Sequence, residues 1–308
     1  MYFKPMSKPH RFFYFYNQNK PLMKNTLLIF VCTLVTQIIT AQNINLQISD
    51  SETKESIEFA TVLLPDYKKS FVSNEKGIFM IDTNKYKLPL KVIVEQFGFE
   101  KQEITLQNNT SVYNIFLDPA TEVLQELIIP PANAKIKERT YGRTNEGSGY
   151  IQGQMNRFDN ENKDSGSEFG LIIKTNDHLK KLKKVHWHIN GITFKRAIFN
   201  LQFYEVENNK PTKRIPHSEI NFSIGENQKG WLVLNTENKD IYLDGNKKIA
   251  AILKVQKIEF NKGENEGYII MNVGAATSNI MTLRSNIYEG WESGPMNFPF
   301  YITVDSYE

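Results

Sequence analysis

The stretch that decides the fold is residues 57–82, IEFATVLLPDYKKSFVSNEKGIFMID. Phe59–Leu64 is an apolar run of strand length, and a second short run follows at Phe71-Val72. Residues 73–77 predict a tight turn, because the glycine that ends them adopts a left-handed backbone at little cost. Residues 78–81 then return as a further strand. This succession predicts antiparallel strands of a sandwich and no catalytic element.

Composition places the chain among globular proteins built of strands. Hydrophobic residues make up 40% of the sequence and charged residues 23%, which is ordinary for a globular protein. Helical periodicity is rare, and turn-forming clusters recur about every 8–12 residues, which predicts an all-β chain. The length of 308 residues favours two domains.

The N-terminal segment has the features of a secretory signal peptide. Lys20 and Lys24 precede a mostly apolar run at residues 27–39, and the small residue Ala41 follows. The apolar run is too short to cross a hydrocarbon core of about 30 Å. We therefore expect a signal peptide at residues 1–41 and an exported chain, in the periplasm, on the outer-membrane surface or secreted, with no transmembrane span after cleavage.

Other interpretations of this segment stay open. The true start could be Met23, the segment could be an uncleaved anchor, or Cys32 could carry a lipid, although bulky Phe30 and Val31 precede it. Cys32 is the only cysteine in the sequence. A chain cleaved after residue 41 therefore has no disulfide and no thiolate zinc site.

Charge gives no reason to expect a nucleic-acid partner. The formal net charge is +3, and residues 1–41 contribute five positive charges and no acid. Residues 42–308 consequently carry a net charge of −2. The excess of positive charge lies in the expected signal peptide, so binding of the remaining chain to nucleic acid or to an anionic membrane surface is not expected.

Residues 43–117 read as a small seven-stranded β-sandwich, because short apolar or alternating runs are separated by turns throughout. The expected strands are 44–48, 59–64, 71–72, 78–81, 90–97, 102–106 and 112–117.

This first region resembles a known family. The resemblance lies in Phe59-Ala60-Thr61-Val62, in the Ser73-Asn74 turn with Gly77 and Phe79, and in Val92–Phe99. Together they resemble the carboxypeptidase-like regulatory domain, a transthyretin-like (Ig-like) sandwich. That module accompanies metallocarboxypeptidases and precedes many outer-membrane transporters and surface proteins of Bacteroidota. The resemblance implies a scaffold or docking role and no activity of its own.

Residues 118–149 are expected to form a linker. Glu122–Ile129 resembles the strand that follows this module in the transporters, but too few amphipathic strands follow for a receptor of the TonB-dependent type. Ala134–Tyr141 is basic and reads as a helical candidate, and Thr144–Gly149 reads as a polar turn.

Residues 150–308 are expected to form a larger, jelly-roll-like double sheet. The order of FNLQFYEV at 199–206 and KGWLVLN at 229–235 resembles a C-terminal sandwich that accompanies the regulatory module, and this implies architecture only. The strand candidates are 168–175, 184–194, 197–206, 219–224, 231–235, 249–260, 268–273 and 298–304.

Two histidines are weak candidates for a metal site. His186 and His188 flank Trp187 on a predicted strand, and residues two apart share a face, so both imidazoles could hold one ion. Val185 and Ile189 share the other face with Trp187, which is the natural core side. The histidines are therefore expected at the solvent side or the rim, and no metal or cofactor is predicted.

Asp159–Asp164 resembles a calcium loop in composition, because oxygen ligands recur at alternate positions. Lys163 falls where a ligand would be needed, and no helix-flanked loop closes with a glutamate. A solvated turn is the favoured interpretation.

All three tryptophans fall in the second region. Trp187 and Trp231 lie in alternating strands and are expected to fill the core. Trp291 lies in a glycine-rich loop near Tyr288, and exposed aromatic rings can stack on sugar rings. Trp291, with Tyr288 beside it, is the candidate ligand contact.

No catalytic residue is predicted, because the sequence has no HExxH, no GxSxG and no zinc-carboxypeptidase His-x-x-Glu pair. The favoured hypothesis is an exported, non-enzymatic envelope or surface protein that binds a glycan or an envelope protein. One alternative is a carbohydrate- or peptide-processing hydrolase with its site in the second region, since glycosidase carboxylates leave no sequence spacing. Another is a structural adhesion protein that self-associates through an edge strand.

Overall fold

The computed structural model describes residues 43–308 apart from 108–109, 121–127, 129, 131–132, 159–160, 163–165, 244, 246 and 276–278. The expected signal peptide, its alternatives and Cys32 lie outside the described residues. Residues 43–308 form one compact unit, which contains two separate large hydrophobic cores.

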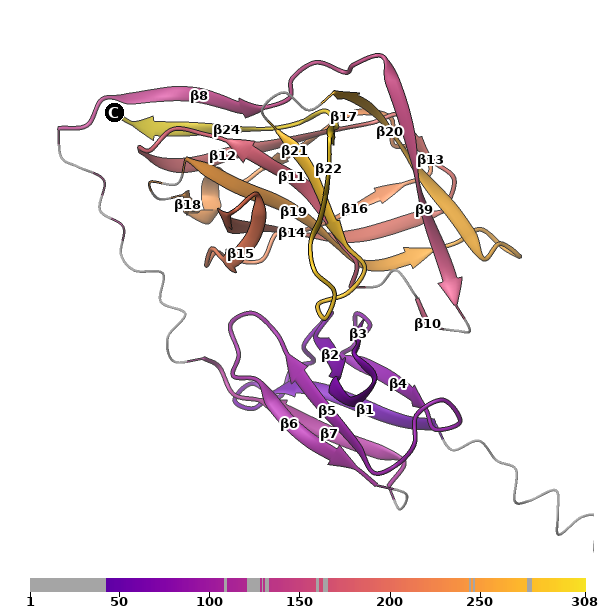
Figure 1. The fold of residues 1–308 in the computed structure, drawn as a ribbon. Helices are drawn as coiled ribbons and strands as arrows, with labels where there is room; N and C mark the ends of the chain where they lie inside the picture. Colours follow the sequence, from indigo (N-terminus) through magenta and orange to yellow (C-terminus); the bar gives the residue numbers. More distant parts are fainter. Residues whose placement is uncertain are drawn as a thin grey trace, which may run out of the picture. The chain divides into compact units, whose positions relative to one another are not determined.

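The first core lies between two small sheets, of strand order β4-β1-β7 and β3-β2-β5-β6 (Figure 1). Pairing is antiparallel except between β1 and β7, which run parallel. The seven strands match the predicted ones closely. They are β1 (Asn43–Asp50), β2 (Thr61–Leu64), β3 (Lys69–Val72), β4 (Ile78–Asp82), β5 (Leu90–Glu95), β6 (Gln102–Leu106) and β7 (Val112–Leu117), with a short 3-10 turn η1 (Pro65–Tyr67).

Alternation explains why these strands bury one face. In β1, Ile44, Leu46 and Ile48 are buried, while Asn43 and Asn45 are exposed. Because successive side chains of a strand point to opposite faces, each sheet presents an apolar face to the other. The sandwich predicted from residues 57–82 is confirmed.

Gly77 holds the central turn in a conformation that only glycine adopts at low cost. Its φ is +68°, and a Cβ there would lie 2.4 Å from the Ile48 carbonyl oxygen. We expect Gly77→Ala to cost more than the about 1–2 kcal/mol of a left-handed L-residue, because the neighbouring strand must also move. Gly98→Ala is the matched control, since its φ is +89° with nothing within 4 Å. Urea unfolding curves showing equal losses for both variants would contradict this account.

The second region contains three sheets. A seven-stranded sheet has the order β15-β14-β19-β11-β21-β22, with β16 paired to β14 (Figure 1). A five-stranded sheet has the order β17-β12-β24-β8, with β18 paired to β12. A second five-stranded sheet has the order β10-β9-β20-β13, with β23 paired to β20. The strands are β8 (Ile136–Gly142), β9 (Gly149–Phe158), β10 (Glu161–Asn162), β11 (Glu168–Lys174), β12 (Leu179–Ile189), β13 (Gly191–Ile192), β14 (Arg196–Glu207), β15 (Lys210–Arg214), β16 (Asn221–Gly225), β17 (Gly230–Asn235), β18 (Tyr242–Leu243), β19 (Lys248–Glu259), β20 (Glu266–Ala275), β21 (Ile280–Arg284), β22 (Glu292–Gly294), β23 (Met296–Asn297) and β24 (Phe300–Tyr307), with a 3-10 turn η2 (Glu237–Lys239).

The core of this region lies on the inner face of the seven-stranded sheet. In β14, Phe199, Leu201 and Phe203 are fully buried in it. Strand alternation then places Asn200, Gln202 and Tyr204 on the outer face of the same sheet. This outer face carries the candidate site.

Three sequence expectations need correction or stay open. The helical expectation for residues 134–141 is wrong, because Ile136–Gly142 is strand β8 and pairs with β24 along its length. Its basic residues Lys137 and Arg139 bind Glu308 at the end of the chain. Three sheets replace the expected two, and the jelly-roll connectivity stays a prediction. In the part of the chain that is described, no helix has the length and apolar character needed to span a membrane.

Candidate ligand-binding cleft

A cleft of about 580 Å³ lies over the outer face of the seven-stranded sheet. Its floor comes from four adjacent strands, β14, β19, β11 and β21. The first region also lines it, with Phe59, Thr61, Glu95, Gln96, Phe97, Phe99, Glu100 and Lys101. The cleft is thus formed by segments that are far apart in the sequence.

Strand register places four polar side chains in one row across the floor. Asn200 on β14 pairs with Lys254 on β19, Lys254 pairs with Glu168 on β11, and Glu168 pairs with Arg284 on β21. Directly paired residues have Cβ atoms about 4.5–5.5 Å apart on the same face. The row therefore alternates amide, ammonium, carboxylate and guanidinium groups over adjacent strands.

Glu168 lies inside the row, between Lys254 and Arg284. It is 5% exposed and forms an ion pair with Arg284, whose guanidinium lies 4.4 Å from the Trp291 ring centre. Tyr204 donates a hydrogen bond to Gln202 at 2.6 Å and lies 3.5 Å from Glu168. Burial, and then the negative charge of Glu168, raise the pKa of Tyr204, so its phenol stays protonated.

Amide groups extend the network along β14. Gln202 Nε2 donates to the side-chain amide oxygen Oδ1 of Asn200 at 2.7 Å, and Asn200 Nδ2 in turn donates to Glu219 and to Asn221. Arg214 pairs with Glu219 at 3.3 Å, and its guanidinium lies 4.2 Å from the Phe97 ring centre. These contacts hold planar polar groups in fixed orientations along the cleft.

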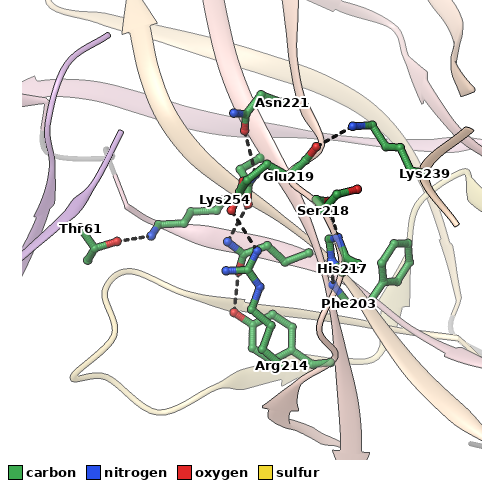
Figure 2. Close-up of polar contacts among 12 residues, drawn as sticks. Thr61, Phe203, Arg214, His217, Ser218, Glu219, Asn221, Lys239 and Lys254 are labelled. Atoms are coloured by element: carbon green, nitrogen blue, oxygen red, sulfur yellow. Dashed lines mark hydrogen bonds and ion pairs between the residues drawn. The ribbon is translucent and has the colours of Figure 1, made fainter. Parts of the chain in front are cut away.

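Lys254 is the cation of the row without a carboxylate partner within ion-pair distance among the described residues. Its ammonium donates a hydrogen bond to the Thr61 hydroxyl at 2.7 Å, as Figure 2 shows. Burial lowers the pKa of Lys254, and nearby Glu168 counteracts part of this effect. The ammonium can therefore turn towards a ligand without breaking an ion pair.

His217 lies beside the cleft as a buried neutral ring. Its Nε2 accepts a hydrogen bond from the Phe203 amide at 3.3 Å, and its Nδ1 lies 2.8 Å from the Ser218 carbonyl oxygen (Figure 2). The ring stacks against Phe97 with centres 6.5 Å apart. Burial lowers the pKa of His217 from 6.5 to about 4, with a smaller contribution from the positive charge of Arg214, while the hydrogen bond to the Ser218 carbonyl acts in the opposite direction.

This histidine should make the protein sensitive to acid. Between pH 6.5 and about 4 the unfolded state binds a proton at His217 that the folded state does not, so stability falls as pH falls through this window. The loss should be about 3 kcal/mol. His217→Gln keeps an acceptor but cannot titrate, so it should flatten this part of the profile in urea unfolding measured from pH 7 to pH 4. Parallel profiles for both proteins would contradict the assignment.

The arrangement suits a polar ligand with many hydroxyl groups. Amides, carboxylates and guanidinium groups offer both donors and acceptors, while Phe59, Phe97 and Phe99 add apolar surface to the lining. Thr212 and Lys101 are exposed on the lining. Within the described residues, no set of three or more His, Cys, Asp and Glu side chains is placed to hold a metal ion.

Neither of the two predicted ligand contacts, Trp291 and Tyr288, is among the residues that line this cleft, although Trp291 contacts Arg284 and Tyr204, which do. Trp291 is half-buried against Arg284 and Tyr204, whose ring centre is 6.0 Å away. Tyr288 is 38% exposed, and no aromatic contact joins it to Trp291 in the described part. Ligand binding by either residue stays a prediction.

The other candidates fall elsewhere. Trp187 is buried as predicted, but Trp231 is only half-buried. His188 is 6% exposed and lies 3.3 Å from Glu146, so its expected place at the solvent side is wrong; His186 is half-buried. The cause is that Trp231 packs against the His188 ring. Of the calcium candidate, 159–160 and 163–164 lie outside the described residues.

The sequence pattern did not single out Glu168, Asn200, Lys254 or Arg284. Each looks like an ordinary polar position on the outer face of a half-buried strand. The available signal was weak: Asn200, Gln202 and Tyr204 alternate with large apolar residues, which identifies a face but not a cleft.

Residues 46–129 match the model of the CarboxypepD_reg-like domain family. This region is therefore a carboxypeptidase-like regulatory domain, as the resemblance predicted, and the match extends into residues 118–129, which the sequence pattern assigned to the linker. The match assigns a family to this region alone. No curated protein sequence matches the chain closely enough to count as a relative.

Solved structures are similar only at low identity. The cysteine protease and lectin-like domains of the surface-layer-associated protein Cwp84 of Clostridium difficile share 11% identity, with TM-score 0.36, over 88% of this chain and 60% of that one. A protein from Bacteroides uniformis proposed to bind carbohydrate shares 12%, with TM-score 0.21, over 75% and 98%. A protein of unknown function from Bacteroides fragilis, proposed to be membrane-associated, shares 12%, with TM-score 0.20, over 86% and 97%. The chain thus spans 60% of the Cwp84 structure.

Proposed function

We propose that this protein is an exported, non-enzymatic binding protein of the cell envelope and that its cleft holds a glycan. The observation that carries the proposal is the row of Asn200, Lys254, Glu168 and Arg284 on the cleft floor. A hydroxyl group both donates and accepts hydrogen bonds, so a sugar needs both kinds of partner. Adjacent strands supply them here in alternation.

Apolar surface beside the row supports a sugar over other polar ligands. Phe59, Phe97, Phe99 and Ile287 line the cleft next to the polar groups. Binding sites of this kind combine apolar surface with a few precisely placed polar groups. A sugar presents the same combination, because its ring carries an apolar C–H face and a polar edge.

The two cleft carboxylates of the second region favour binding over catalysis. Glu168 pairs with Arg284 and Glu219 pairs with Arg214. A glycosidase needs one carboxyl group that donates a proton to the leaving oxygen. Two carboxylates engaged by arginines instead orient donors, which is the task of a binding site.

The N-terminal segment and the first region support the proposed location in the cell envelope. Residues 1–41 have the sequence features of a secretory signal peptide. The carboxypeptidase-like regulatory domain would then act as a scaffold or docking unit for the second region. An envelope protein that contacts this module is the other partner that the proposal accommodates.

Affinity electrophoresis tests the proposal. The purified protein would be run in native gels cast with soluble xyloglucan, galactomannan, mixed-linkage β-glucan, alginate or polygalacturonate. We expect one or more of these polysaccharides to retard the protein relative to bovine serum albumin. Equal mobility in all gels would contradict glycan binding.

Hydrolysis is the second candidate, because four carboxylates line the cleft: Glu168 and Glu219 from the second region, and Glu95 and Glu100 from the first. The same polysaccharides, incubated with the purified protein, would release reducing ends if it were a glycosidase. We expect no release above the buffer control. Release that a Glu→Gln substitution at any one of these four positions abolishes would replace the binding proposal with an enzymatic one.

A further inference from the structure

A second group of aromatic side chains lies on the five-stranded sheet that contains β12, away from the seven-stranded sheet that carries the cleft. In the sheet β17-β12-β24-β8, His186 pairs with Val233 on one side and with Tyr301 on the other, and Tyr301 pairs with Gly142. Figure 1 shows these four strands side by side. Trp231 is the neighbour of Val233 two positions along β17, on the same face. We call Trp231, His186 and Tyr301 the aromatic strip.

The rings of the aromatic strip contact one another. His186 stacks on Tyr301 with ring centres 4.1 Å apart and planes 8° from parallel. Trp231 meets Tyr301 at 5.1 Å with an angle of 66° between the planes. The His188 ring packs against Trp231 at 5.1 Å. Each ring is therefore held in position by another ring, which fixes the strip before any ligand arrives.

The strip lies on the outer face of its sheet. Phe300 and Ile302 alternate with Tyr301 along β24 and belong to the core, so Tyr301 points away from it. All three rings of the strip are half-buried, and Val233 beside them is 50% exposed. Gly142 is the β8 neighbour of Tyr301 and has no side chain with which to cover that ring.

Hydrogen-bonding groups border the strip. The Thr303 hydroxyl lies 3.4 Å from His186 Nε2, and Glu146 lies 3.3 Å from His188 Nε2. His188 Nδ1 is buried and has no hydrogen-bond partner among the described residues. Burial lowers the pKa of His186, and Lys184 lowers it further, so this imidazole is neutral at neutral pH. The surface thus combines uncharged ring faces with polar groups at their edges.

We propose that the aromatic strip is a second binding site, which takes the sugar rings of a single, soluble glycan chain. Apolar C–H faces of sugars stack on aromatic rings, and their hydroxyls reach polar groups at the rim. The 66° angle between Trp231 and Tyr301 makes the strip a corner and not a flat platform. A corner fits one twisted chain, whereas a crystalline polysaccharide surface needs coplanar rings. The cleft is on another sheet, so this site stands independently of the cleft.

The three tryptophans separate the two sites experimentally. Trp231 belongs to the strip, Trp291 lies beside the cleft under Arg284, and Trp187 is in the core. Each indole N–H gives one signal in a 15N–1H NMR spectrum, and three Trp→Phe variants assign the signals. The purified protein would be titrated with the hexasaccharides of β-1,4-glucose, β-1,3-glucose, β-1,4-xylose and α-1,4-glucose.

We expect one or more hexasaccharides to shift the Trp231 signal and leave Trp187 in place. Tyr301→Ala should weaken the affinity for the hexasaccharide at least tenfold. If Tyr301→Ala displaces the Trp187 signal, which would show that the core has not folded normally, His186→Ala takes its place. Tyr150→Ala, on β9 and 70% exposed, is the matched control and should bind normally. A shift at Trp291 alone would support the cleft and overturn the strip. If no hexasaccharide shifts the Trp231 signal, the proposal is also overturned. Binding of the protein to microcrystalline cellulose without a Trp231 shift by any hexasaccharide would likewise overturn it.

Discussion

Replacing Glu168 with leucine is expected to lower the free energy of unfolding by about 3–5 kcal/mol, the cost of removing one partner of a buried ion pair. Glu168 is 5% exposed, and the side chain of its partner Arg284 is 13% exposed. Without the carboxylate, the guanidinium keeps its positive charge in a desolvated position. Tyr204 would also lose a neighbouring acceptor. The loss should appear as a lower midpoint in urea unfolding.

A double variant separates the ion pair from simple packing. Glu168→Leu with Arg284→Met removes both charges, and a well-packed apolar replacement of a buried pair is often neutral or stabilising. The double variant should therefore regain most of the stability lost by Glu168→Leu alone. If the double variant is as unstable as the single one, the charge interaction is not the cause.

Trp187→Ala should destabilise the protein by a similar amount, about 3–5 kcal/mol. Trp187 is 2% exposed and meets Phe199 at 5.6 Å and Phe169 at 5.9 Å between ring centres. Alanine would leave a cavity in the centre of the core that these rigid rings cannot fill. Trp231→Ala is the control in the same sheet, because Trp231 is half-buried. Equal losses in urea unfolding would contradict the placement of Trp187.

The fold was predictable where burial leaves a period of two in the sequence. Ile44, Leu46 and Ile48 alternate with polar residues, and the strand they predicted is β1. FNLQFYEV at 199–206 predicted β14 for the same reason. The helical expectation for residues 134–141 failed because β8 has little apolar alternation; it is stabilised mainly by its pairing with β24. Such pairing is a tertiary effect that local sequence does not contain.

The candidate cleft was not predictable from the sequence. Glu168, Asn200, Lys254 and Arg284 are brought together only by the register of four strands. A shift of one residue in any strand would turn its side chain into the core. Sequence patterns predict that a strand has a polar face, but they do not predict which strands become neighbours or what lies over that face. Trp291 was singled out as a ligand contact, which stays a prediction, and its contacts with Arg284 and Tyr204 were not foreseen.

The central claim is that the polar cleft binds a glycan, and Lys254→Met tests it most directly. Methionine keeps the side-chain stem and removes the ammonium that donates to Thr61. The proteins with and without Lys254→Met are compared in a Tyr301→Ala background, which removes the aromatic strip as a second glycan site. In native gels cast with the polysaccharide that retards this background most, we expect Lys254→Met to abolish most of the retardation. Tyr150→Ala, outside the cleft, should be retarded fully. Full retardation of a folded Lys254→Met variant would contradict the assignment of the cleft as the binding site.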